Sequence, residues 1–314
     1  MSRGQRWFGH FSAALLGYLL FVIVFGAWVR ITGSGAGCGD HWPSCQGVLV
    51  PRTPSQATLI EYSHRLSSGL LGVAALALPV WAFRCFSPGH ATRRWSVCTL
   101  LLVAVEAAIG AGLVKNGLVA DDASLARAVV VALHLVNTLL LTASAALTAV
   151  AARNPPARAA QPRPARRRVP RPAPRAPLDW LSLGVLIGLG LVAASGAVTA
   201  LGDTLFPVGA SFREGSEHFL VQLRVLHPIL ACALVVAALG LARLLANLPG
   251  TRPFALALGG LGLLQLGLGA VNVLLRAPGW LQLGHLLIAQ LFWLSAVLAA
   301  RGFWFARGLD DSQA

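Results

Sequence analysis

Hydrophobic residues in this chain gather into long runs, and polar residues gather between them. A run of roughly 20 apolar residues is the length that an α-helix needs to cross the hydrocarbon core of a bilayer. Eight runs satisfy this criterion, at residues 11–31, 64–86, 95–114, 125–152, 178–201, 218–246, 253–275 and 280–305. The pattern predicts an all-α integral membrane protein with eight transmembrane helices.

The composition agrees with this prediction. Hydrophobic residues make up 56% of the 314 residues and charged residues only 11%, whereas about a quarter of a soluble domain is charged. The first run follows a basic segment, SRGQR, and could be taken for a signal peptide. Its apolar core is long and its end, GAWVRITGSG, lacks a convincing small-x-small cleavage site, so we expect a retained helix.

The formal net charge of +14 is unevenly distributed. With both termini placed in the cytoplasm, 17 of the 25 Lys and Arg residues lie on the inner side of the membrane. This asymmetry satisfies the positive-inside rule with eight spans. We therefore predict a multi-pass protein of a bacterial-type cell membrane with both termini cytoplasmic.

The densest basic segment is rich in both proline and arginine and covers residues 153–177. Such a segment cannot build a core, and we expect a disordered cytoplasmic linker that touches anionic lipid headgroups. RNA binding is the alternative, but we expect no nucleic-acid partner. The linker separates residues 1–152 from residues 178–314, each with four predicted helices.

The two halves resemble each other. Glu106 stands four residues before Gly110 in the third run, and Gln265 stands four residues before Gly269 in the seventh. An even number of spans per repeat leaves both copies in the same orientation. We therefore predict two parallel-repeat four-helix bundles related by a pseudo-two-fold axis along the membrane normal.

Four histidines repeat in the same way: His64 and His134 in the first half, His227 and His285 in the second. Each lies in an even-numbered run, in the outer half of the membrane. A single such histidine is more often an interhelical hydrogen-bonding residue. Two pairs at matched depth favour two sites in which paired imidazoles hold a heme iron, because zinc usually needs further protein ligands and only Glu61 lies near in sequence.

Heme propionates need cationic partners near the membrane surface. Arg30, Arg65 and Arg224 are predicted at the outer level and are candidates for this role. The alternative for each is an ordinary snorkelling side chain.

Cys38 and Cys45 lie seven residues apart in a Gly-rich loop on the predicted outer, oxidising side. Their proximity and compartment favour a disulfide bond. The bond could be a structural staple or could exchange electrons with a partner. A metal site that includes His41 would lack an obvious fourth ligand.

Together these residues resemble the heme A synthases of aerobic respiratory chains. The resemblance is carried by GAWVRITGSGAGC with a second cysteine seven residues later, by EYSHR, and by histidines at 134, 227 and 285 in alternate helices. It covers the chain except for the linker, which is no part of the family pattern. Glu106 is a second departure, because a neutral amide such as Gln265 is expected there.

The resemblance implies that heme O is the substrate and that one ring methyl is oxidised to a formyl group through a hydroxymethyl intermediate. The first half would hold the substrate heme through His64 and His134. The second half would hold a heme b cofactor through His227 and His285. Heme O synthase and cytochrome oxidase assembly factors are implied as partners, and a homo-oligomer stays open.

Glu61 matches the residue regarded as catalytic in that family. It precedes His64 by three residues and so shares its helix face. Its carboxylate could stabilise positive charge at the methyl carbon or accept a proton from water. Arg224 takes the corresponding place before His227, so the second half lacks the acid.

Two other functions explain part of the pattern. A di-heme b-type electron-transfer protein would use the four histidines, but it predicts hemes at two depths and gives no reason for Glu61. A transporter would explain the duplication, but midplane Gly/Pro breaks in the spans are not evident.

Overall fold

A computed structural model describes residues 1–153, 176–207, 218–248 and 250–311. The predicted Arg/Pro-rich linker lies outside these residues except for its two ends. The prediction that it is disordered therefore stays a prediction.

The first half contains four long helices, as predicted. After α1 comes a single 3₁₀ turn, η1 (Ser34–Ala36), within the loop 32–55. The long helices are α1 (Arg3–Ile31), α2 (Gln56–Cys85), α3 (Ala91–Lys115) and α4 (Leu125–Arg153).

The second half adds four more spans. The elements are α5 (Ala176–Leu205), α6 (Phe219–Gln222), η2 (Leu223–Val225), α7 (Leu226–Leu245), α8 (Arg252–Leu274) and α9 (Gly279–Asp311). Within the described residues, eight helical segments are long and apolar enough to cross a membrane, with α6, η2 and α7 forming one of them. The predicted all-helical class and the eight spans are confirmed.

The boundaries show two differences from the apolar runs. Helix α2 begins at Gln56, two turns before residue 64, because Ser55 caps it by accepting a hydrogen bond from the Thr58 N–H at 3.1 Å. The sixth span is not one continuous helix over 218–246, because the 3₁₀ turn η2 interrupts it. The interruption lies near one end of the span and not at its middle.

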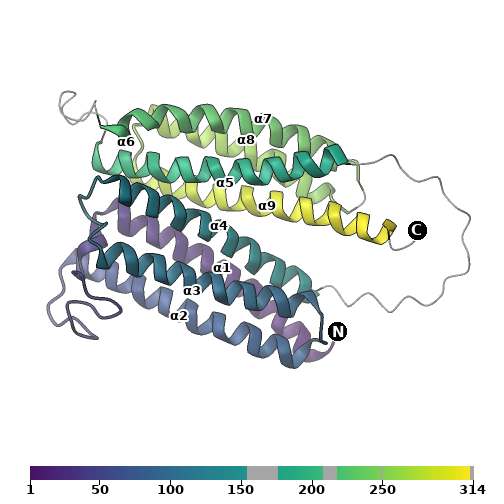
Figure 1. The fold of residues 1–314 in the computed structure, drawn as a ribbon, viewed down its shortest axis with the longest axis horizontal. Helices are drawn as coiled ribbons and strands as arrows, with labels where there is room; N and C mark the ends of the chain where they lie inside the picture. Colours follow the sequence, from purple (N-terminus) through teal and green to yellow (C-terminus); the bar gives the residue numbers. More distant parts are fainter. Residues whose placement is uncertain (154–175, 208–217, 249, 312–314) are drawn as a thin grey trace, which may run out of the picture.

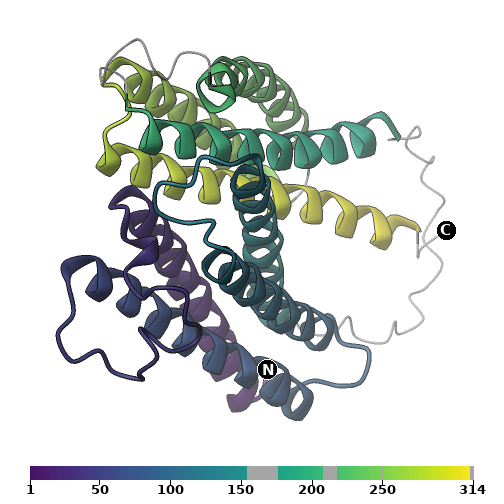
Figure 2. The same cartoon turned by 60° about the vertical axis from the view of Figure 1, so that its left-hand side comes forward.

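Each half closes a ring of contacts. Helices α1, α2, α3 and α4 contact one another in sequence and α4 returns to α1; α5, α7, α8 and α9 do the same (Figure 1). The halves meet where α4 contacts α5 and α9, and where α1 contacts α9. Helix α1 begins, and α9 ends, at the end of the molecule opposite the loop 32–55, and the turned view separates the two groups of helices (Figure 2).

The contact between the halves is closely packed and partly polar. The indole N–H of Trp293 in α9 donates to the Leu139 carbonyl in α4 at 2.7 Å, and Thr142 donates to Gln290 at 3.2 Å. Much of α4 from residue 143 to 152 is alanine, and small side chains allow helices to approach closely in a membrane. Helices α4 and α9 therefore form the centre of the protein.

This packing leads to a stability prediction. Ala146 on α4 is 2% exposed among core residues of both halves, so Ala146→Leu should destabilise the fold by about 1–3 kcal/mol through overpacking. Val129 lies on the same helix but is 49% exposed, and Val129→Leu serves as the control. Unfolding by SDS from mild detergent would measure both variants, and equal midpoints would contradict the central placement of α4.

Candidate functional site

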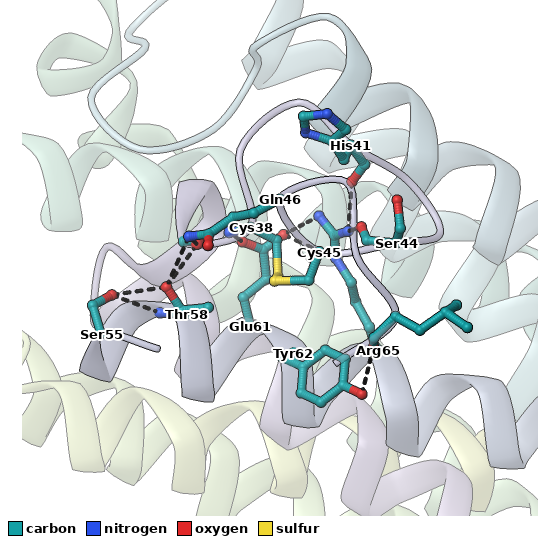
Figure 3. Close-up of a disulfide and its surroundings, with 12 residues drawn as sticks. Cys38, His41, Ser44, Cys45, Gln46, Ser55, Thr58, Glu61, Tyr62 and Arg65 are labelled. Carbon is teal, nitrogen blue, oxygen red and sulfur yellow. Dashed lines mark hydrogen bonds and ion pairs between the residues drawn. A yellow bond between two sulfur atoms is a disulfide. The ribbon is translucent and has the colours of Figure 1, made fainter. Parts of the chain in front are cut away.

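Glu61 is buried near the amino-terminal end of α2, with 3% of its surface exposed. One carboxylate oxygen, Oε2, accepts the backbone N–H of Cys38 at 2.7 Å. The other, Oε1, accepts from Arg65, one turn further along the helix, with Nε at 3.1 Å (Figure 3). A loop and a helix thus hold the carboxylate in one position.

Cys38 and Cys45 are joined by a disulfide bond, as predicted. Arg65 fastens the same loop, because its Nη1 donates to the carbonyls of His41 and Ser44, each at 2.6 Å (Figure 3). Gly37 allows the loop to lie directly on the start of α2, since a Cβ there would come within 2.5 Å of the Ala57 backbone. The disulfide loop therefore covers Glu61.

His64 points from α2 toward α1. A Cβ on Gly26 would lie 3.1 Å from its ring, and the Phe25 ring meets it edge-on at 5.5 Å between centroids. Its Nδ1 atom is buried and has no hydrogen-bond partner. His134 lies close enough to interact with His64 electrostatically.

His134, on α4, faces a carboxylate. Glu106 of α3 places Oε1 3.4 Å from the Nδ1 atom of His134, within ion-pair distance. Asn137 and Thr138 donate hydrogen bonds to the same carboxylate. Sequence reasoning singled out Glu106 as a departure from the family pattern but did not connect it to His134.

His227 and His285 face each other in the second half. Their ring centroids are 6.4 Å apart and their planes are nearly perpendicular. Nδ1 of His227 contacts the Ser195 hydroxyl at 3.1 Å, and Nε2 of His285 contacts the Gln265 amide nitrogen at 3.0 Å. A Cβ on Gly196 would lie 2.8 Å from the His227 ring.

Several contacts recur in the two halves. Gly26 in α1 and Gly196 in α5 each lie against the histidine of the next long helix. Sequence reasoning missed these glycines, although the matching segments GAWV and GAVT could have shown them. Gln265 contacts His285 and Glu106 contacts His134, although Gln265 meets Nε2 of its histidine and Glu106 meets Nδ1.

The three candidate arginines are all engaged by protein groups. Arg30 reaches from α1 into the second half, where it donates to Ala200 O at 2.6 Å, to Gln282 Oε1 at 3.0 Å and to Thr204. Arg224 pairs with Asp203 at 2.8 Å, an acid that sequence reasoning missed. Their predicted contact with heme propionates stays a prediction.

A metal site of the zinc type has no support in the part of the chain that the structure describes. No group of three His, Cys, Asp or Glu side chains gathers there. The Cys38, His41 and Cys45 alternative also loses its two thiolates to the disulfide bond. The loop 32–55 therefore covers Glu61 and lacks the free thiolates that a Cys38, His41 and Cys45 site would need.

Comparison with known proteins gives the family. The model of the family COX15-CtaA, described as cytochrome oxidase assembly protein, matches residues 9–297. A protein of Thermus thermophilus named protoheme IX farnesyltransferase is 43% identical over 296 residues, which is 90% of this chain and 46% of that protein.

Heme A synthases match over shorter segments. The protein of Geobacillus kaustophilus is 41% identical over 117 residues, 37% of this chain and 36% of the relative. That of Halalkalibacterium halodurans is 40% identical over 99 residues, 32% of this chain and 33% of the relative. The chain spans less than half the length of these curated relatives.

The family model covers nearly the whole chain and the eight apolar helices, so this multi-pass membrane protein belongs to the COX15-CtaA family of cytochrome oxidase assembly proteins.

Proposed function

We propose that the protein is a heme A synthase, which oxidises a ring methyl group of heme O to a formyl group through a hydroxymethyl intermediate. The product would supply heme A to terminal oxidases. Family membership and the heme A synthases among its relatives support this proposal. The observation that carries it is a buried, fixed carboxylate, Glu61, one helical turn from a histidine with an unpartnered ring nitrogen.

The spacing of the histidine pair in the second half is compatible with heme iron. Two imidazole nitrogens each about 2 Å from one metal ion place the ring centroids about 6 Å apart, and those of His227 and His285 are 6.4 Å apart. His64 and His285 each retain a buried Nδ1 without a hydrogen bond, and Nδ1 of His134 has only the ion-pair contact with Glu106. His227 and His285 would hold heme b, which when bound supplies an electron acceptor, and His64 and His134 would hold the substrate.

Glu61 is suited to act on the substrate's edge. Oε1 accepts two hydrogen bonds from Arg65, whereas Oε2 accepts one, from the Cys38 N–H, and retains a further lone pair. The carboxylate can stabilise positive charge developing at the methyl carbon and can accept a proton from water. Arg65 and the disulfide loop keep it in place without blocking either role.

The second half is suited to a different task. Arg224 stands where the first half has Glu61, and it lies on the 3₁₀ turn η2, where it pairs with Asp203. The second half therefore has no acid at the position that Glu61 occupies in the first. We propose that the first bundle, residues 1–152, carries the chemistry and that the second, residues 178–314, carries electrons.

The arrangement in the membrane completes the proposal. Each half forms a closed ring of four spans, and the matched glycine and Glu/Gln contacts support a pseudo-two-fold axis along the membrane normal. The positive-inside rule favours cytoplasmic termini. Heme O synthase and oxidase assembly factors are proposed partners, since heme O must be delivered within the membrane.

The name of the Thermus relative offers a second candidate, farnesyl transfer to protoheme IX. Binding a diphosphate commonly uses Mg²⁺ held by carboxylates, and the described residues gather no such acidic cluster. The name can describe the part of that protein which this chain does not match. A di-heme electron carrier is the third candidate and leaves Glu61 without a role.

One experiment separates the three. The protein is expressed in a host that makes heme O but no heme A, and the extracted hemes are separated by chromatography. Appearance of the hydroxymethyl or formyl heme supports the synthase, and unchanged heme O with bound heme b supports the carrier. In a host that makes only protoheme, appearance of heme O would support the transferase.

In the same host, Glu61→Gln should reduce product formation by about 100-fold or more, because it removes the charge and the proton acceptor. Heme b should stay bound. Asp40→Asn is the control, since Asp40 is an acid of the loop that covers Glu61 and its side chain is 84% exposed. Normal product formation by Glu61→Gln would remove Glu61 from the chemistry.

His227→Ala should remove the absorption of heme b from the purified protein and leave heme O bound, because the two ligand pairs lie in different halves. His64→Ala should show the reverse. Pyridine hemochrome spectra of both variants measure this. Loss of the substrate heme alone from His227→Ala would contradict the assigned halves.

Replacing both Cys38 and Cys45 by serine should lower product formation and leave heme b content unchanged. The reason is that the disulfide loop supplies the Cys38 N–H that holds Glu61. Cys232→Ser, at an exposed free cysteine of α7, is the control. Full activity of the double variant would show that Arg65 alone is sufficient to hold the loop.

A further inference from the structure

Glu106 is an acid in the middle of a transmembrane helix, where a charged side chain is costly unless it is paired. Its partners all come from one face of α4: His134, Asn137 and Thr138 are spaced by three and four residues. Asn137 Nδ2 donates to Oε2 and also to the Leu102 carbonyl at 3.1 Å, while Thr138 donates to Oε1. These donors hold the carboxylate with Oε1 3.4 Å from Nδ1 of His134.

We propose that Glu106 is a positioning residue for the heme in the amino-terminal half. With heme O bound, Glu106 would hold the Nδ1–H of His134 and leave Nε2 for the iron, and its charge would make this imidazole a stronger donor to ferric iron. The inference rests on the proposed function in one respect, namely that His134 is a heme ligand.

The physical basis is general. A histidine ligand commonly donates its other ring N–H to a carboxylate or carbonyl, which fixes the tautomer, orients the ring and raises its basicity. Loss of such a partner typically costs 10- to 100-fold in affinity for the metal. Here the carboxylate, its two donors and the histidine come from only two helices, α3 and α4, which are packed against each other.

The second half provides a built-in comparison. Gln265 occupies the place of Glu106 in α8, but its amide nitrogen contacts Nε2 of His285, at 3.0 Å, whereas Glu106 lies beside Nδ1 of His134. The amide is neutral, so it can orient the ring but adds no negative charge. The two hemes would therefore sit in different electrostatic surroundings, with the ferric form favoured in the first half relative to the second.

The test is an anaerobic redox titration of the full-length protein loaded with heme O and containing heme b, followed by optical and EPR spectroscopy. Glu106→Gln should raise the midpoint potential of one heme only. A tenfold loss of preference for ferric iron corresponds to about 59 mV for a one-electron couple. Gln265→Glu should lower the potential of the other heme and leave the first unchanged.

A milder variant should shift the midpoint potential of the same heme in the opposite direction. Thr138→Val preserves the shape of the side chain but removes the hydrogen bond to Oε1, the oxygen that faces His134. The carboxylate then retains more of its charge, so the potential of the same heme should fall. This variant also serves if Glu106→Gln does not accumulate in the membrane.

The outcomes are distinct. Opposite shifts by Glu106→Gln and Thr138→Val on one heme support the proposal. Unchanged potentials in both variants, with normal heme content, would overturn it and leave Glu106 as a packing residue between α3 and α4. Failure of the wild-type protein to bind heme O or to form heme A would instead count against the proposed function.

Discussion

A polar side chain inside a bilayer has no water to bind, so it must find its partner within the protein. This constraint organises the end of the molecule that carries the loop 32–55. Glu61 is paired with Arg65 and a backbone N–H, Arg224 with Asp203, and Glu106 with groups of α4. Each pairing joins elements that are distant in the chain or fixes a loop on a helix. These buried polar pairs therefore help to fix the positions of the helices relative to one another.

The same scaffold carries different charges in its two halves. Both place a glycine of the first helix against a histidine of the second, which leaves room for the ring. The halves then diverge at two points, with Glu61 opposed to Arg224 and Glu106 opposed to Gln265. Only the second difference changes the net charge, because Glu61 is paired with Arg65 and Arg224 is paired with Asp203. Under the proposed function, a duplicated heme-binding bundle in which the two copies diverged at these positions would account for a catalytic half and an electron-transfer half.

Apolar run length was sufficient to predict the eight spans, but not their ends. Polar caps such as Ser55 extend helices past the apolar residues, so Glu61 lies inside α2 and not at its entrance. The disulfide followed from spacing and compartment. The contact of Glu106 with His134 did not, because it depends on how α3 and α4 are rotated about their axes, which hydropathy does not specify. The predicted heme ligation is untested by the fold, although the facing rings in the second half are compatible with it.

Arg30 has a consequence for how the protein is made. It lies in α1, yet its partners Ala200, Thr204 and Gln282 belong to α5 and α9, which are synthesised after the whole amino-terminal bundle. During synthesis the guanidinium must stay hydrated at the membrane surface or bind lipid phosphate until those helices arrive. The amino-terminal bundle therefore cannot reach its final form by itself, and its maturation is tied to insertion of α9.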